Sequence, residues 1–251
     1  MFMRLVQAKA KPDLLWKLRQ NYEERVVPTL QKTPGCLYAC LMQSSHVPEE
    51  VISMTMWESQ KHAEDYERSG VFGQLIEEAK PMLADSSEFH LELSKDLKLE
   101  YVPTPFEPTV TSMPVAVMSH ELNTGFNNPT QMFLRIVSVK LKSDKRDEFR
   151  ELYVHEVIPA LEATKGCRHA YLLIPDRDKS EAMSVTIWES KAAAEEYETG
   201  GFAPLLDRVK HTFTGLSQWK MNLGEKRGQS ATSDDISVDG YFFVEGKSFR
   251  G

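Results

Sequence analysis

The chain has 251 residues, of which 41% are hydrophobic and 27% charged, a composition typical of a folded globular protein. Its net charge of −7, without any Lys/Arg-rich run, argues against nucleic acid as a partner, because phosphate binding needs a clustered basic face. No apolar run approaches the ~20 residues that span a bilayer, and the amino-terminal segment lacks a signal-peptide pattern. We therefore expect a cytoplasmic protein with no membrane partner.

The first 94 residues predict one unit of alternating strands and helices. Apolar alternation predicts four strands, over 3–10, 36–43, 51–58 and 88–93. Apolar residues at helical spacing predict two helices, over 14–31 and 60–83. Asp13 and Ser59 stand at the cap positions, and Gly70 interrupts the second helix. The order is β-α-β-β-α-β, the ferredoxin-like plan.

A second unit of the same kind is predicted over 132–223. The stretch SMTMWES at 53–59 returns as SVTIWES at 184–190, an offset of 131 residues that aligns both units without a gap. Matched pairs include Arg4 and Arg135, Tyr22 and Tyr153, Tyr66 and Tyr197, and the cap residues Asp13 and Asp144. A sheet with both helices on one side leaves its other face bare. We therefore expect an α+β protein in which the two units pack sheet to sheet.

Two segments lie outside the units. Residues 95–131 contain five prolines, at 103, 105, 108, 114 and 129, and are interpreted as an extended linker with a short strand over 115–118. Residues 224–251 form a tail that begins rich in Gly, Ser and Asp but carries YFFV at 241–244. Such aromatics are unusual in a disordered tail. We expect them to dock on a groove or on a neighbouring subunit, which would join a homo-oligomer through the tail.

The cysteines do not predict a disulfide framework. Cys36, Cys40 and Cys167 are few and odd in number, and the first two lie too far apart along one strand to pair. We interpret all three as free thiols used as small hydrophobic side chains.

The repeated unit resembles the antibiotic biosynthesis monooxygenase (ABM) domain of the dimeric α/β-barrel superfamily. The resemblance lies in the Pro…Pro-Gly-Cys step after the first helix, the T-x-W-E-S strand and the segment AEDYERSG at 63–70. It implies that the two sheets form within one chain the barrel that relatives form by dimerising. Some members oxidise aromatic phenols or quinols with O₂ and no cofactor or metal, others cleave haem, and many have no known activity.

The resemblance also points to site residues. The family's third-strand tryptophan falls on Trp57 and Trp188, and the position at which many relatives carry a histidine falls on Tyr66 and Tyr197. A tryptophan here is also typical of a core side chain, which is the interpretation we favour from size alone. Its strand neighbours Ser53 and Thr55 share its face, however, and would suit a partly polar pocket.

The second unit has the better candidates for acid–base chemistry. His169 and Tyr171 share a strand face, and His155 lies on the first helix of that unit. An imidazole is a better base for a phenol than tyrosine is. The predicted catalytic residues are therefore His169, His155 and Tyr197. The predicted substrate contacts are Trp188, Tyr153, Tyr171, Trp57 and Tyr66. For Arg4 and Arg135 a surface or interface salt bridge is favoured over a contact to an anionic substrate.

Two functions follow from the sequence. No histidine is matched between the units, which argues against a duplicated haem or metal site. The first hypothesis is a cofactor-independent monooxygenase acting on a small aromatic or quinol-type substrate. The alternative is a non-catalytic binding or scaffolding barrel that holds an apolar metabolite. The residues that line the two cavities should distinguish them.

Overall fold

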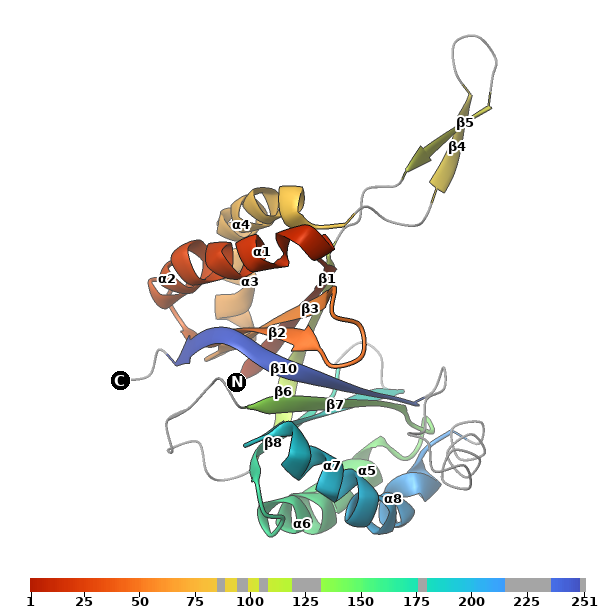
Figure 1. Ribbon diagram of the computed structural model, residues 1–251. Coiled ribbons are helices and arrows are strands. Elements are labelled where there is room, and N and C mark those ends of the chain that lie inside the picture. Colours follow the sequence, from red (N-terminus) through yellow and green to blue (C-terminus); the bar gives the residue numbers. More distant parts are fainter. Residues whose placement is uncertain are drawn as a thin grey trace.

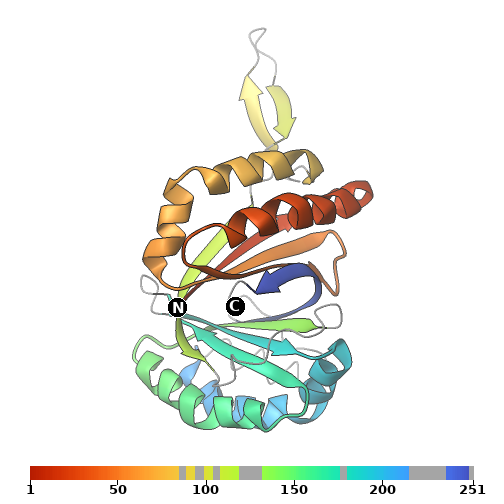
Figure 2. The same ribbon diagram turned by 90° about the vertical axis from the view of Figure 1, so that its left-hand side faces the viewer.

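The computed structural model describes residues 1–84, 89–93, 99–103, 108–118, 132–175, 180–214 and 236–248. Two layers of helices enclose a central barrel of strands (Figures 1 and 2). The helices of residues 1–84 cover one side of the barrel, and those of the second repeat cover the other (Figure 2). The expected α+β architecture of two units is confirmed.

The first unit has three strands and two helical segments between them. Its strands are β1 (Phe2–Lys9), β2 (Cys36–Ser44) and β3 (Glu50–Trp57). Its first helical segment runs through η1 (Pro12–Leu14), α1 (Leu15–Asn21), the π-helical turn η2 (Tyr22–Val26) and α2 (Val27–Gln31). Its second comprises α3 (Gln60–Arg68), α4 (Val71–Ala79) and η3 (Lys80–Met82).

The second unit repeats this order closely. Its strands are β7 (Phe133–Lys140), β8 (Cys167–Leu173) and β9 (Glu181–Trp188). Its first helical segment runs through α5 (Arg146–Leu152), the π-helical turn η5 (Tyr153–Val157) and α6 (Ile158–Glu162). Its second comprises α7 (Lys191–Gly200), α8 (Phe202–Val209) and η6 (Lys210–Thr212).

The helix caps were predicted correctly for the second helices only. Ser59 Oγ accepts from the His62 amide at 3.4 Å, and Ser190 Oγ accepts from the Ala193 amide at 3.2 Å. The predicted caps at Asp13 and Asp144 are wrong, because the cap positions are Leu14 and Lys145 and neither makes a side-chain cap bond. In the first unit the turn η1 already contains Asp13, so its carboxylate lies within the first turn. Gly70, with φ of 81°, separates α3 from α4 in a left-handed conformation that favours glycine.

The barrel is closed by two strands that serve both units. The strand order is β1-β3-β2-β10-β7-β9-β8-β6, where β6 is Thr109–Met118 and β10 is Ile236–Ser248. Strand β6 pairs antiparallel with β1 and, farther along, with β8. Strand β10 pairs in the same way with β7 and then with β2. Each of the two strands therefore completes its own unit's sheet and reaches into the other.

The strand predicted over 88–93 is present, but the prediction that it belongs to the sheet of the first unit is wrong. Strand β4 (Phe89–Leu93) pairs instead with β5 (Leu99–Pro103) in a separate two-stranded sheet that projects from the barrel (Figure 1). The strand beside β1 is β6, which contains the short strand expected over 115–118 inside the predicted linker. The tail aromatics at 241–244 lie in β10, so this segment pairs with two strands of its own chain. Apolar alternation predicts that a segment forms a strand but does not predict which strand it pairs with.

The prediction that the 131-residue offset runs through both units without a gap is also wrong. Leu83 forms a bridge with Ala10, and Phe213 forms the equivalent bridge with Leu141, which places the second helical segments 130 residues apart at this point. The second unit is one residue shorter where α8 begins, directly after Gly201. The slip falls in the turn between two helices, where a lost residue does not change the register of a sheet.

Side chains alternate between two kinds of core. Met54 and Met56 point into the barrel, in an apolar cluster that both units share. Trp57 lies on the other face of β3, under the helices of its own unit. Leu41 and Leu172 occupy equivalent places between sheet and helices in the two units, as the repeat predicts.

Candidate functional site

Each unit has a pocket between its helices and the outer face of its sheet. The first pocket has a volume of about 90 Å³, and its lining includes Arg4, Tyr22, Ser53, Thr55, Tyr66 and Phe72. The second pocket has a volume of about 50 Å³, and its lining includes Arg135, Tyr153, Ser184, Thr186, Tyr197 and Phe202. The remaining walls of both are mainly aliphatic. Six equivalent positions, three of them aromatic, thus line an apolar cleft in each unit.

The repeated tryptophan supports the pocket wall from behind. Trp57 is fully buried, stacks on Tyr66 with ring centroids 5.0 Å apart, and donates its indole N–H to Thr55 Oγ1 at 2.9 Å. Trp188 does the same with Tyr197, at 4.9 Å, and with Thr186, at 2.9 Å. The tryptophans do not themselves line these pockets but belong to the core between sheet and helices, as the interpretation from size expects. Their size fills the space behind the tyrosine ring and fixes its orientation.

A tyrosine from each first helix approaches the pocket from the opposite side. Tyr22 OH lies 2.9 Å from Ser53 Oγ, and Tyr153 OH lies 2.8 Å from Ser184 Oγ. Each of these tyrosines is the first residue of its π-helical turn, η2 or η5, an irregularity often found at functional sites. The substrate contacts predicted from the sequence include Tyr153 but not its match, Tyr22. The matched serine two residues before each threonine, Ser53 or Ser184, was the signal for both.

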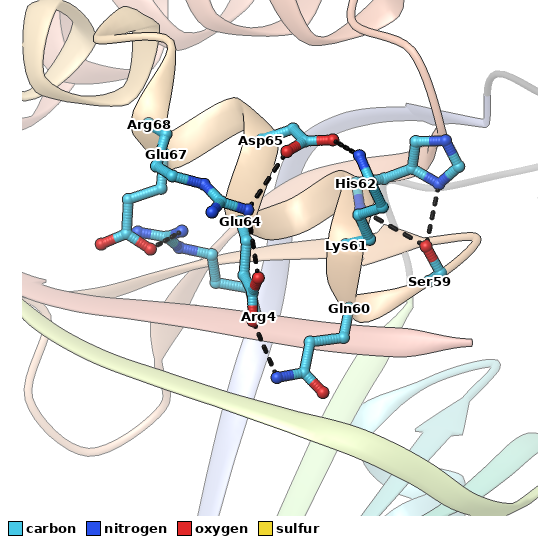
Figure 3. Close-up of polar contacts among 9 residues, drawn as sticks. All are labelled: Arg4, Ser59, Gln60, Lys61, His62, Glu64, Asp65, Glu67 and Arg68. Carbon is cyan, nitrogen blue, oxygen red and sulfur yellow. Dashed lines mark hydrogen bonds and ion pairs between the residues drawn. The ribbon is translucent and has the colours of Figure 1, made fainter.

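The two arginines are buried in the pockets and are not at the surface. Arg4 and Arg135 are 2% and 3% exposed and lie against the rings of Phe72 and Phe202, with guanidinium carbons 4.1 and 4.2 Å from the ring centroids. Each ion-pairs with a glutamate on the second helix, Arg4 with Glu67 at 3.0 Å and Arg135 with Glu198 at 2.6 Å. Figure 3 shows Arg4 extending from β1 beneath α3 to reach Glu67.

Burial keeps the pocket tyrosines protonated. It raises the pKa of the Tyr22, Tyr66 and Tyr153 phenols well above the ordinary value. It also raises the pKa of Tyr197 to about 12, with the nearby Arg135 guanidinium acting in the opposite direction. At neutral pH these side chains can donate hydrogen bonds to a ligand oxygen but are poor proton acceptors.

The histidines predicted as bases lie outside the second pocket. His155 is exposed on η5, with Nε2 3.4 Å from Glu151. His169 is buried and pairs across the sheet with Ile187, whose side chain belongs to the barrel interior. Its ring lies 6.3 Å from that of Tyr171, so the shared face is confirmed. That face is turned away from Trp188, because a register shift after Cys167 sets the alternation of β8.

The four tyrosines among the predicted site residues lie in three places. The second pocket brings together Tyr153 and Tyr197, and the first pocket contains Tyr66. Tyr171 lies in the barrel interior beside His169 and lines neither pocket. The face on which a strand residue lies depends on register, which the sequence of β8 alone does not supply.

The cysteines are free, as predicted. Cys36 and Cys40 are buried and Cys167 is half-buried, and burial raises the pKa of each thiol to about 12. Thiols with so high a pKa are poor nucleophiles.

Two features are absent from the described residues, a metal-binding cluster and a membrane-spanning helix. No group of three or more His, Cys, Asp or Glu side chains in these segments is arranged to hold a metal ion. No helix in the described part of the chain is long and apolar enough to cross a membrane.

Two ferredoxin-like units that share one barrel and carry matched pockets define a fused form of the dimeric α/β barrel. A family model described as antibiotic biosynthesis monooxygenase matches residues 1–78 and 132–201, one match in each unit. Together the matches cover more than half of the chain, which therefore belongs to the antibiotic biosynthesis monooxygenase family. No significant match was found among curated proteins.

Solved structures share this fold over nearly the whole chain. A protein from Fusobacterium nucleatum with a provisional monooxygenase name aligns with a TM-score of 0.68 and 8% identity, over 98% of this chain and 94% of its own. One from Lactobacillus acidophilus, named in the same way, aligns at 0.63 and 7% identity, over 99% and 96%. An anthrone oxidase-like protein aligns at 0.59 and 12% identity, over 99% and 93%. Identities this low establish the fold alone.

Proposed function

We propose that the protein is a cofactor-independent monooxygenase that oxidises a small aromatic phenol- or quinol-type substrate with O₂ in its helix–sheet pockets. The observation that carries the proposal is the repeated pocket itself, in which polar groups converge on an otherwise apolar cleft in both units. Membership of the monooxygenase family and the fold shared with an anthrone oxidase-like protein agree with it.

The pocket residues suit a planar substrate with one oxygen substituent. Tyr66 and Phe72 in the first pocket, and Tyr197 and Phe202 in the second, offer ring edges and faces for an aromatic ligand. The protonated tyrosine hydroxyls and the Arg4 or Arg135 guanidinium offer hydrogen bonds to its oxygen. In a cleft with few polar walls such bonds are stronger than in water and stabilise developing negative charge.

The chemistry needs no oxidant besides O₂. An electron-rich phenolate passes an electron to O₂, and the resulting pair recombines at the activated carbon. For an anthrone-type substrate the methylene carbon gains one oxygen atom as a carbonyl, and its two hydrogens leave with the other oxygen as water. O₂ is reduced by four electrons, all of which come from the methylene carbon as its two C–H bonds are replaced by one C=O bond. The protein's part is to bind the ring, hold its oxygen as the anion and exclude bulk water.

The proton of the phenol has no obvious protein acceptor in either pocket. Among the described residues that line them, none is a histidine or a carboxylate. His155 and His169, proposed as bases from sequence, lie elsewhere, so the reason for preferring the second unit disappears. We therefore assign equivalent sites to both units, with the substrate losing its proton to solvent as it enters.

Oxygen uptake by the purified full chain tests this function. Anthrone and simple hydroquinones would be supplied in air with a metal chelator present, and the uncatalysed rate subtracted. We expect catalysed uptake with either substrate, and one isotopically labelled oxygen in the product from anthrone when labelled O₂ is used. A double Tyr66→Phe, Tyr197→Phe variant should lose roughly 10²-fold in rate, the usual effect of removing a hydrogen-bond donor to an oxyanion. Binding of these phenols without any turnover would instead support the ligand-binding alternative.

A further inference from the structure

We propose that each pocket contains a built anion-binding site, centred on Arg4 in the first unit and on Arg135 in the second. The site takes the carboxylate or phenolate oxygen of a planar aromatic ligand. The inference rests on the proposed function for its choice of pocket, but anion binding at equilibrium does not require turnover.

Each arginine has hydrogen-bonding capacity that the described residues leave unused. Arg4 Nε and Nη2 are buried and have no hydrogen-bond partner in the described part of the chain. The same holds for Nη2 of Arg135. A buried N–H without a partner is unfavourable, and one on a charged group more so. A ligand oxygen that accepts from these groups would remove this penalty, and the planar fork of arginine fits an anionic oxygen well.

The guanidinium groups are held in place before any ligand binds. Phe72 and Phe202 each lie close to a guanidinium, and Tyr66 and Tyr197 lie at 5.9 and 5.6 Å from the two guanidinium carbons. A ring packed against the guanidinium leaves its N–H groups directed outward in their own plane. The ligand therefore meets an ordered donor, with little side-chain entropy left to lose on binding.

The Arg–Phe contact is kept although the two units differ in length here. Phe72 and Phe202 are 130 residues apart, and the arginines are 131 apart, because the second unit lost one residue before α8. Both phenylalanines nevertheless lie against their arginines at 4.1 and 4.2 Å. Two different local sequences thus place a phenylalanine ring against the equivalent arginine in each unit.

The existing counter-ions are at the rim and can be displaced. Glu67 binds Nη1 of Arg4 with a side chain that is 57% exposed, and Glu198 binds Nε of Arg135 with one that is 31% exposed. Because both carboxylates retain access to water, releasing either arginine does not bury an unpaired carboxylate. Each glutamate therefore competes with an incoming anion for the same guanidinium, and its removal should strengthen anion binding.

Binding of 4-nitrophenol to the full-length protein tests the site, because the phenol and phenolate forms of this probe differ in visible absorption. We expect the phenolate to bind about tenfold more tightly than the phenol, the difference between a charge-assisted and a neutral hydrogen bond. The apparent pKa of the bound probe then falls by about one unit. In the double Arg4→Met, Arg135→Met variant the preference should disappear.

A second pair of variants removes the competing carboxylates. The double Glu67→Gln, Glu198→Gln variant should bind the phenolate several-fold more tightly than the wild type. Its matched control is Glu64→Gln, Glu195→Gln, which makes the same charge changes on the same helices at residues that ion-pair elsewhere. The control should leave the affinity nearly unchanged. These glutamates are at the surface or rim, so the comparison remains informative even if the arginine variants do not fold.

The outcomes separate this site from the proposed oxygenase. Equal binding of phenol and phenolate by the wild type, or no difference between the two glutamate pairs, would overturn the anion site. Nitrophenolate binding with the predicted preference supports the site even if no phenol is oxidised, a result that would count against the oxygenase alone. Undiminished oxidation by the folded arginine double variant would keep the oxygenase and remove the anion site.

Discussion

Trp57 stacks on Tyr66 with ring centroids 5.0 Å apart and planes inclined by 30°. The indole is fully buried and the tyrosine lines the first pocket, so the two roles that the sequence left as alternatives for the tryptophan fall on two different residues. Trp57 positions the ring, and Tyr66 presents it to a ligand.

This division predicts different effects for substitutions at the two residues. Trp57→Phe removes the hydrogen bond to Thr55 and leaves a cavity behind the tyrosine, and should lower the free energy of unfolding by roughly 1–3 kcal/mol. Tyr66→Phe retains the stacked ring and should change stability by much less. Urea unfolding followed by circular dichroism measures both. Trp16→Phe, at an exposed position, is the control and should be neutral. A larger loss from Tyr66→Phe than from Trp57→Phe would contradict the assignment.

Buried tyrosines predict a loss of stability at alkaline pH. Burial raises the pKa of Tyr197 from 10.0 to about 12, so the folded state keeps its phenol proton where the unfolded state releases it. This contribution is fully present below pH 10 and is lost as the pH rises toward about 12. The free energy of unfolding should fall in that window more steeply in the wild type than in Tyr197→Phe. Urea titrations at a series of pH values test this, and identical slopes would refute it.

The repeat and the fold class could be predicted because they depend on patterns within each unit. The Trp57/Trp188 step, the Ser59 and Ser190 caps and the apolar faces of the helices all have local causes. The pairing of strands and the sheet face on which each side chain lies could not be predicted, because both depend on the register between strands that are distant in sequence. Strand β6 was therefore treated as linker, and His169 was assigned to the wrong side of β8. The burial of Arg4 was missed for a similar reason, since the ring that covers it, Phe72, belongs to helix α4, far from β1 in the sequence.

The absence of a histidine or carboxylate among the described lining residues predicts the pH dependence of turnover. If the substrate enters as an anion, kcat/KM should rise with pH through the ionisation of the phenol itself. Two substrates with different phenol pKa values should then give profiles displaced by that difference. His155→Gln, an exposed change, should leave both profiles unaltered. A profile that stays fixed when the substrate changes, or that moves in the histidine variant, would indicate a protein base instead.

Closure of the barrel predicts that the carboxyl-terminal strand is essential for solubility. Strand β10 hydrogen-bonds to β2 on one side and to β7 on the other, so removing residues 236–251 exposes the edges of both units at once. Exposed strand edges pair readily with other chains. We expect the truncated protein to dimerise or aggregate, and the isolated segment 1–94, which lacks both β6 and β10, to do so as well. Analytical ultracentrifugation over a range of concentrations measures this.

The β4–β5 hairpin provides the matched control for this truncation. It contains strand residues too, but it forms a sheet of its own outside the barrel. Replacing residues 89–103 with a short flexible linker removes both strands of the hairpin while every barrel pairing is kept. This variant should sediment like the wild type. A soluble, folded monomer after removal of β10, or aggregation after removal of the hairpin alone, would show that the eight-stranded closure is not what keeps the two units together.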